Sequence, residues 1–201
     1  MPSAAILAGG RATRFGGRDK SALVVDGRSI LTRQMRELSQ VADDIMIVGD
    51  GTTQPRREQS GEIAVRMVRD RVPDCGPLAG LDASLVAARH EVLVLVACDM
   101  PFVTAAFLDY LLSLVVDADA VVPRTEDGYH PLCAVYTRAC QPVVADRLAR
   151  GRLSVVELFD EITVRVVPIA EINAFGGPRL LANVNTPAAF NEIGALQRHK
   201  A

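Results

Sequence analysis

Apolar runs of strand length alternate along the chain with segments whose apolar residues recur at helical spacing. The runs are continuous rather than alternating, which is typical of strands buried on both faces of a mostly parallel sheet. Strands and helices that follow one another in this way predict an α/β fold of three layers. The expected strands are 3–8, 44–49, 62–68, 91–98, 118–123, 132–136 and 162–168, and the expected helices are 29–40, 77–89, 104–116, 137–150, 155–160 and 186–197.

Several of the expected helices begin with residues that suit a helix start. Ser29, Thr104 and Thr186 are candidate N-caps, and Pro77 and Pro187 stand in first turns, where proline is tolerated. Polar segments at 51–61 and 125–129 are expected to be loops, the second of them near the site or beside it.

A glycine-rich, cationic loop follows the first expected strand. It opens at Gly9 and Gly10, continues through Arg14 and reaches Lys20. Glycines let backbone N–H groups approach an anion closely, and Arg and Lys add charge, so the loop is suited to phosphates. It is not a Walker A loop, because Asp19 stands where that motif needs glycine, and its glycine spacing does not fit a dinucleotide fingerprint. Taken alone, the loop could also be a flexible, solvated connection.

Asp99 follows the most hydrophobic expected strand. Parallel sheets bind ligands at the carboxyl ends of their strands, so this carboxylate is expected at the ligand edge. A hard oxygen donor there suits Mg²⁺, which usually takes one or two carboxylates together with substrate phosphates. The alternative role, a cap for the next helix, fits Thr104 better.

A second carboxylate and a compact turn come earlier in the chain. Asp70 ends the expected strand before it, and Gly76 to Gly80 then lead into a helix. Small residues such as Gly80 allow close approach to a flat ligand such as a purine, although a plain turn and helix start explain the segment equally well.

Two further polar segments are candidates for the site. Asn183 and Asn185 flank a helix start and could cap it or offer amides to a polar ligand. His130 is a candidate for the substrate cleft, whereas His90 is expected at the surface.

Composition narrows the class of protein. The chain has 201 residues, 49% of them hydrophobic, which suits one globular domain spanning residues 1–201. A net charge of −2 gives no nucleic-acid footprint, and no apolar run is long enough to span a membrane. The four cysteines show no metal-ligand spacing and are expected to be reduced thiols. Without a signal peptide, the expected location is the cytoplasm.

Together the motifs resemble the molybdenum cofactor guanylyltransferases, also called molybdopterin-guanine dinucleotide synthases. The segments that carry this resemblance, in the family's order, are Leu7-Ala8-Gly9-Gly10, Arg14-Phe15-Gly16, Lys20, Gly76-Pro77-Leu78-Ala79-Gly80, Cys98-Asp99-Met100-Pro101 and Asn183-Val184-Asn185-Thr186-Pro187. The resemblance implies a Rossmann-like nucleotidyltransferase fold and transfer of GMP from GTP to the terminal phosphate of molybdenum-molybdopterin, with release of pyrophosphate. It also leaves room for transient contacts with molybdoenzymes or their chaperones.

The resemblance also implies roles for individual residues. Arg14 and Lys20 would stabilise the phosphates, and Asp99 would hold Mg²⁺, which makes these three the expected catalytic residues. The nucleotide would be bound by Leu7, Ala8, Gly9, Gly10, Lys20, Asp70, Gly80 and Asp99, and the pterin by His130, Arg152 and Asn185.

Two departures from the family pattern and three rival functions qualify this interpretation. Gly49 stands where the family often has Asn, and the segment between Asp70 and Gly76 is one residue short. The rivals are a molybdopterin cytidylyltransferase, a sugar-phosphate nucleotidyltransferase and a non-catalytic adaptor that binds GTP or the molybdenum cofactor. The Gly9-Gly10 pair favours guanine, because the loop of the cytidylyltransferases usually reads Leu-Ala-Ala-Gly.

Overall fold

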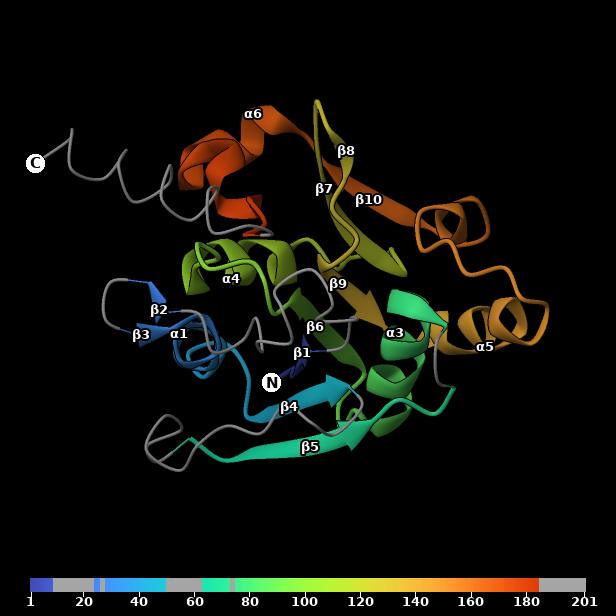
Figure 1. The fold of residues 1–201 in the computed structure, drawn as a ribbon. Helices are drawn as coiled ribbons and strands as arrows, with labels where there is room; N and C mark the ends of the chain where they lie inside the picture. Colours follow the sequence, from blue (N-terminus) through green and yellow to red (C-terminus); the bar gives the residue numbers. More distant parts are fainter. Residues whose placement is uncertain (9–23, 26–27, 50–62, 73–74, 185–201) are drawn as a thin grey trace, which may run out of the picture.

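The computed structural model describes residues 1–8, 24–25, 28–49, 63–72 and 75–184 of the chain (Figure 1). The expected loop at 51–61 and the expected helix at 186–197 lie outside these residues.

Half of the central sheet is parallel. Strand β1 (Ser3–Leu7) lies between β4 (Asp44–Gly49) and β6 (Val92–Ala97), and β5 (Val65–Arg69) forms the edge beside β4. All three of these pairings are parallel, so the four strands end at the same edge of the sheet. The sequence predicted each of these strands: the bounds of β4 are as predicted, and those of the other three differ by at most three residues.

The other half of the sheet is mixed. Strand β9 (Cys133–Thr137) pairs antiparallel with both β6 and β7 (Ala120–Thr125), while β10 (Val164–Val167) pairs parallel with β7. The short strand β8 (Gly128–Tyr129) forms a hairpin with β7 at the segment expected to be a loop. The reversal of β9 has a simple cause: its connection to β7 is too short for the crossover that a parallel neighbour needs.

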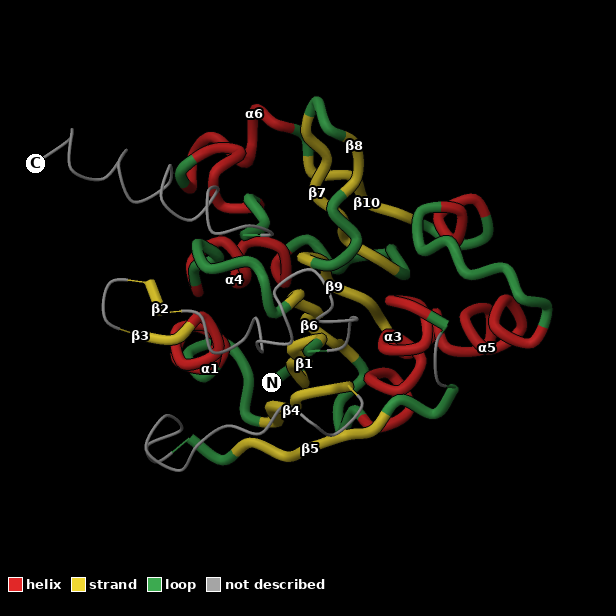
Figure 2. The backbone as a smooth tube through the Cα atoms, in the orientation of Figure 1, coloured by secondary structure: helices red, strands yellow, loops and turns green. Residues whose placement is uncertain are grey.

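Helices cover both faces of the sheet (Figures 1 and 2). On one face lie α1 (Ile30–Leu38) and α4 (Ala105–Ser113), and on the other α3 (Gly76–Ala87) and α5 (Gln141–Ala149). This arrangement confirms the predicted three-layer α/β fold.

The central strand shows why both faces are apolar. Ala4 and Ile6 belong to the core beneath α1 and α4, whereas Ala5 and Leu7 belong to the core beneath α3 and α5. Each of these side chains is at most 7% exposed. Successive residues of a strand point to opposite faces, so a continuous apolar run is what a sheet between two helix layers requires.

The predicted helix starts are confirmed where the structure describes them. Ser29 Oγ accepts a hydrogen bond from Thr32 N at 3.1 Å, and Thr104 Oγ1 accepts one from Phe107 N at 3.4 Å. Pro77 lies in the first turn of α3.

Some elements differ from the expectation. The helix expected over 137–150 begins as a 3-10 turn, η3 (Arg138–Cys140), and the one over 155–160 is a 3-10 turn, η4 (Glu157–Asp160). The sequence did not predict the small hairpin of β2 and β3 or the short helical turns after β10. These elements are β2 (Val24–Val25), β3 (Arg28–Ser29), α6 (Ile169–Ile172), η5 (Asn173–Phe175) and η6 (Gly177–Leu181).

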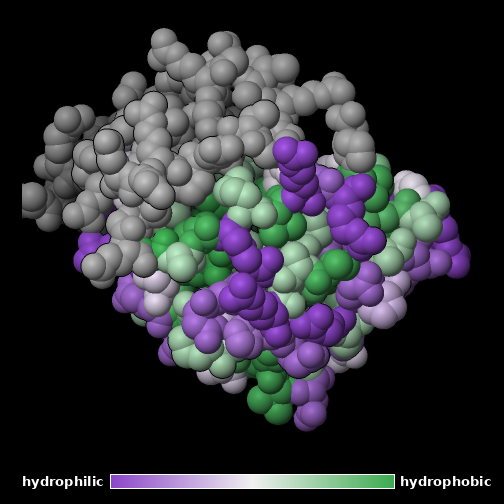
Figure 3. All heavy atoms as spheres, turned by 90° about the horizontal axis from the view of Figure 1, so that it is seen from below, coloured by the Kyte–Doolittle hydropathy of each residue, from purple (hydrophilic) through white to green (hydrophobic). Residues whose placement is uncertain are grey.

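The edge strand β5 carries Arg66 and Arg69. Charged side chains on an edge oppose pairing with another sheet. Figure 3 views the molecule from this side and shows hydrophilic residues across the surface, with apolar ones between them. Within the described ranges, no helix is both long enough and apolar enough to cross a membrane.

Candidate active site

The ends of the parallel strands bring three predicted site residues to one edge. Ala8 N donates to Val48 O at 2.8 Å just beyond β1, and Asp70 N donates to Gly49 O at 3.1 Å just beyond β5. Cys98 N donates to Leu7 O at 3.0 Å, which ties the end of β6 to the end of β1. Ala8, Asp70 and Asp99 therefore leave the sheet at its carboxyl edge, where α/β sheets bind ligands.

Asp99 lies in a turn that other elements hold closely. Its carbonyl oxygen accepts a hydrogen bond from Val184 N at 2.8 Å, and the carbonyls of Ala97 and Met100 on either side are bonded to Gln34. One oxygen of the Asp99 carboxylate, Oδ1, is buried. Thr104 caps α4, as expected, so helix capping does not account for Asp99.

The bond from Val184 brings the C-terminal motif to the same place. Val184 is 1% exposed and follows Asn183, the first amide of that motif. The preceding turn η6 also touches the Asp99 loop, because the Arg179 guanidinium lies over the Phe102 ring at 4.7 Å from its centroid. Two motifs that are distant in sequence thus meet at the end of β6.

Gly80 lies where α3 crosses the end of β1. A Cβ placed on Gly80 would lie 3.0 Å from Leu7 Cδ2, so the glycine permits close packing of helix on strand. The structure therefore gives Gly80 a packing contact with Leu7, which is another residue predicted to bind the nucleotide. Gly76, at the start of α3, has a positive φ of 66°, a conformation that glycine adopts without strain.

His130 also lies at the carboxyl edge. Its backbone N donates to Pro123 O at 2.8 Å beside the end of β7, and Leu132 O accepts from Ala97 N at 2.7 Å at the end of β6. The imidazole Nε2 lies 2.8 Å from Thr125 Oγ1. Partial burial lowers the pKa of His130, and the nearby Asp127 carboxylate opposes that shift without reversing it.

Arg152 has a different setting. It lies beyond the end of α5 and forms an ion pair with Glu161 at 2.9 Å. Arg147, whose side chain is fully buried, reaches the same Glu161 and also Glu157 Oε2 at 3.0 Å. Phe159 in this segment packs edge-on against Tyr129, the neighbour of His130, with ring centroids 5.2 Å apart. This aromatic contact connects the Arg152 segment to the neighbour of His130.

The remaining predicted residues lie outside the part that the structure describes. These are Gly9, Gly10, Arg14, Lys20 and Asn185. The structure describes the chain up to Ala8 before the first of these segments and up to Val184 before Asn185.

Gln34 and Arg147 are two buried polar residues that the sequence analysis missed. Gln34 stands in the buried stripe of α1 with Leu31, Met35 and Leu38, so a polar residue within an apolar helical repeat was the available signal. Arg147 likewise occupies a buried position of α5.

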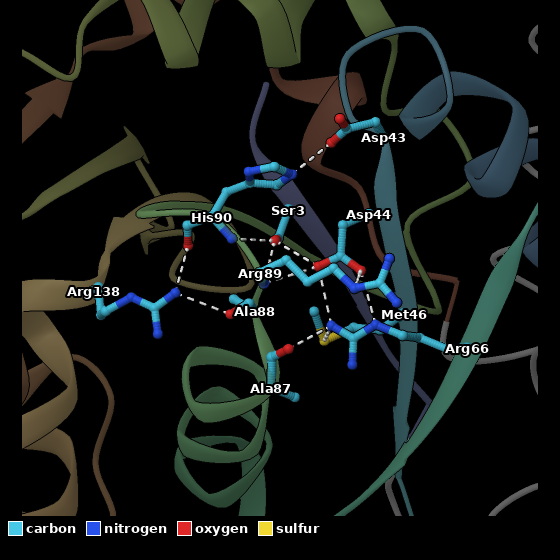
Figure 4. Close-up of polar contacts among 10 residues, drawn as sticks. All are labelled: Ser3, Asp43, Asp44, Met46, Arg66, Ala87, Ala88, Arg89, His90 and Arg138. Carbon is cyan, nitrogen blue, oxygen red and sulfur yellow. Dashed lines mark hydrogen bonds and ion pairs between the residues drawn. The ribbon is translucent and has the colours of Figure 1, made fainter.

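A dense polar cluster lies at the opposite, amino edge of the sheet (Figure 4). Asp44 there accepts hydrogen bonds from Ser3 Oγ at 2.6 Å, from Arg66 Nε at 2.8 Å and from Arg89 N at 3.1 Å. Burial alone would raise the pKa of Asp44, but these hydrogen bonds outweigh it and hold the pKa well below its usual range. His90 is partly exposed, as predicted, and pairs with Asp43 at 2.7 Å. These bonds join the amino ends of β1, β4 and β5 to the end of α3.

The metal-ligating residue types do not gather into clusters in the described part of the chain. No group of three or more His, Cys, Asp or Glu that could hold a metal ion occurs among these residues. All four cysteines are free, and Cys133 and Cys140 are buried, as expected of reduced thiols. Burial raises the pKa of the Cys133 thiol to about 12.

The whole architecture recurs in a solved structure. Molybdopterin-guanine dinucleotide biosynthesis protein A from Archaeoglobus fulgidus superposes with a TM-score of 0.79 over 98% of this chain and 99% of that one, at 22% sequence identity. This likeness shows that the two share a fold.

The class of protein follows from the family model that the sequence matches, which is that of an NTP transferase domain. The chain belongs to the MobA-like NTP transferase family, whose model matches residues 4–162. A molybdenum cofactor guanylyltransferase of Desulfosudis oleivorans is 34% identical over 94% of this chain and 93% of its own length. One from Pseudomonas entomophila is 31% identical over 90% of this chain and 92% of its own.

Proposed function

We propose that this nucleotidyltransferase transfers GMP from GTP to the terminal phosphate of molybdenum-molybdopterin, with release of pyrophosphate. The observation that carries the proposal is the meeting of three family motifs at one edge: Cys98 N bonds to Leu7 O, and Val184 N bonds to Asp99 O. The relatives from Desulfosudis oleivorans and Pseudomonas entomophila are guanylyltransferases, which supports guanylyl rather than cytidylyl transfer and an enzyme rather than an adaptor.

We propose Asp99 as the ligand of a Mg²⁺ ion. Asp99 fits this role because it is a hard oxygen donor at the ligand edge, on a turn whose flanking carbonyls are bonded to Gln34. The lack of a three-residue cluster in the described part also fits an ion that shares its ligands with substrate phosphates. When bound, Mg²⁺ would neutralise charge on the phosphate oxygens.

In this proposal an oxygen of the pterin phosphate attacks the α-phosphorus of GTP in line with the departing pyrophosphate. One P–O bond forms as another breaks, and no general base is needed because the attacking oxygen is already anionic. The work of the protein is then to align two polyanions and offset their repulsion. Arg14 and Lys20 carry the charge suited to the triphosphate and the leaving pyrophosphate.

The two substrates would occupy different parts of the edge. Leu7, Ala8, Asp70 and the start of α3 would face the nucleotide, with Gly80 allowing the close packing beneath it. His130 lies on the other side of β6, which supports a place in the acceptor half. Arg152 and Asn185 remain proposed pterin contacts on the strength of the family resemblance alone.

We further propose that the chain acts as one domain in the cytoplasm. One sheet runs through the described residues from β5 to β10. Free thiols at Cys75, Cys98, Cys133 and Cys140 fit a reducing compartment.

The test uses GTP labelled at either the α-phosphate or the γ-phosphate and identifies the product that carries each label. With molybdenum-molybdopterin and Mg²⁺ present, an α-phosphate label should move to a pterin dinucleotide, and a γ-phosphate label should appear in pyrophosphate. Appearance of the γ label in inorganic phosphate, or failure of the α label to reach the pterin, would contradict the proposal.

A further inference from the structure

Gln34 is a buried glutamine on the apolar face of α1. It is 3% exposed and lies on the same stripe as Leu31 and Leu38. Its Nε2 donates to Ala97 O at 2.7 Å and to Met100 O at 3.1 Å, residues 63 and 66 positions away. Both hydrogens of one side-chain amide are thus directed at the turn after β6.

These two carbonyls lie on either side of Cys98 and Asp99. Within the turn itself, Met100 N donates to Ala97 O at a long 3.3 Å, so the local hydrogen bond is weak. Gln34 joins both ends of the turn to one rigid point on α1, while Val184 N holds the Asp99 carbonyl from another side. The backbone that carries the Asp99 carboxylate is therefore fixed by groups from two other segments.

Packing alone does not explain why a glutamine stands at position 34. Its Oε1 is buried and has no hydrogen-bond partner among the residues that the structure describes. Leu or Met would fill the same space without burying an unsatisfied oxygen. Buried polar groups that break the local rule of packing are expected where function needs them.

We propose that Gln34 is a positioning residue for Asp99: by bracing the turn from Ala97 to Met100 it sets the carboxylate for the metal and the triphosphate. The inference rests on the proposed role of Asp99 as the metal ligand. Partners that orient a metal ligand typically change metal affinity or activity by about 10- to 100-fold when they are removed. Gln34 should act on metal and nucleotide binding and leave the affinity for the pterin unchanged.

The experiment measures binding of Mn²⁺, a paramagnetic substitute for Mg²⁺, by electron paramagnetic resonance in the presence of GTP and without turnover. Gln34→Met keeps the volume and removes both donated hydrogen bonds, and should weaken Mn²⁺ binding about 10-fold or more. Leu38→Val is the matched control, because Leu38 lies one turn later on the same buried stripe. It should lower stability but bind Mn²⁺ as the unmodified protein does.

Gln34→Glu supplies a readout that a merely structural role would not give. Its carboxylate would face two carbonyl oxygens, whereas its protonated form regains one donor. The Mn²⁺ affinity of this variant, relative to the unmodified protein at each pH, should therefore fall as pH rises. This variant also keeps the inference testable if Gln34→Met fails to fold.

The Asp99→Asn variant distinguishes the proposed positioning role of Gln34 from the proposed metal-binding role of Asp99. If Asp99→Asn loses Mn²⁺ binding while Gln34→Met and Gln34→Glu bind normally at every pH, the role of Gln34 is wrong and the proposed metal ligand stands. If Asp99→Asn itself binds Mn²⁺ normally, the metal role of Asp99 fails and the role of Gln34 fails with it.

Discussion

Asp99 comes just after the end of β6, and His130 comes just before the start of β9, which is the antiparallel neighbour of β6. Their chemistry differs. Asp99 offers the oxygen atoms of a carboxyl group, whereas burial disfavours the charged form of His130. At the scale of residues, the edge of the sheet thus pairs a candidate metal ligand with a neutral hydrogen-bonding ring.

Asp99→Asn should lower kcat about 10²- to 10³-fold, because the loss of one charge-stabilising group in phosphoryl chemistry has that order of effect. The fold should remain, since Thr104 caps α4 without help from Asp99. Steady-state kinetics at low Mg²⁺ concentration, with circular dichroism of the same samples, provide the measurement. Near-normal turnover of the folded variant would remove Asp99 from the mechanism.

His130 should titrate below the usual histidine value of about 6.5, because burial lowers its pKa. The unfolded chain then takes up this proton at a higher pH than the folded protein does. The contribution of His130 to stability is therefore fully present above about pH 6.5 and is lost as pH falls through the folded pKa. Nuclear magnetic resonance of the imidazole Cε1–H gives the titration, and urea unfolding of His130→Gln should lose this part of the pH dependence. A titration at or above the usual value would contradict the assignment.

At the scale of elements, two polar clusters add hydrogen bonds and ion pairs to the packing of the apolar cores. The Asp44 cluster joins the amino ends of β1, β4 and β5 to the end of α3, where Arg66 also donates to Ala87 O at 2.5 Å (Figure 4). The Arg147 cluster fastens the segment between α5 and β10. Both clusters act through charges that a single substitution removes.

Asp44→Asn should destabilise the protein by about 2–3 kcal/mol, because it leaves Arg66 facing an amide instead of a carboxylate. The neighbouring Asp43→Asn is the control: Asp43 is about half exposed, at 51%, and its loss should cost less than about 1 kcal/mol. Since the pKa of Asp44 is lowered on folding, its contribution is present above the unfolded value of about 4 and is lost as pH falls. Urea unfolding should therefore show the gap between the unmodified protein and Asp44→Asn narrowing below about pH 4. A gap that is constant with pH would contradict this account.

Arg147→Met should cost about 2–4 kcal/mol, because the buried guanidinium is bonded to both Glu157 and Glu161. Amide hydrogen exchange should become faster across residues 154–161, which these bonds fasten. Arg150→Met on the same helix is the control: Arg150 is 65% exposed and pairs with Asp146, so its loss should cost less than about 0.5 kcal/mol. Equal effects of the two substitutions would contradict the role given to Arg147.

At the scale of the whole molecule, the sequence predicted the features that depend on residues close together along the chain. The predicted strand 44–49 has a run without polar side chains between Asp44 and Asp50, and it forms β4 with the predicted bounds. The carboxyl-edge site followed from the same logic, because Ala8, Asp70 and Asp99 each end a predicted strand. The direction of β9 was not predictable in this way, since orientation depends on which strand it pairs with and not on its own residues.

The contacts that the sequence did not predict join residues that are far apart along the chain. Gln34 and Ala97 are 63 positions apart, and only the packing of α1 on the sheet brings them together. The bond between Val184 and Asp99 likewise joins segments that composition and periodicity treat as unrelated. The motifs predicted the chemistry of the proposed site, whereas the contacts that support it could be found only from the fold.

The central claim is guanylyl transfer at this edge, and pyrophosphate release tests it most directly. GTP, CTP and ATP are supplied in parallel, each with Mg²⁺ and with molybdenum-molybdopterin either present or omitted. The account predicts release from GTP that requires both the metal and the pterin. Release from CTP in place of GTP, or no release from any nucleotide by a protein that still binds GTP, would contradict it.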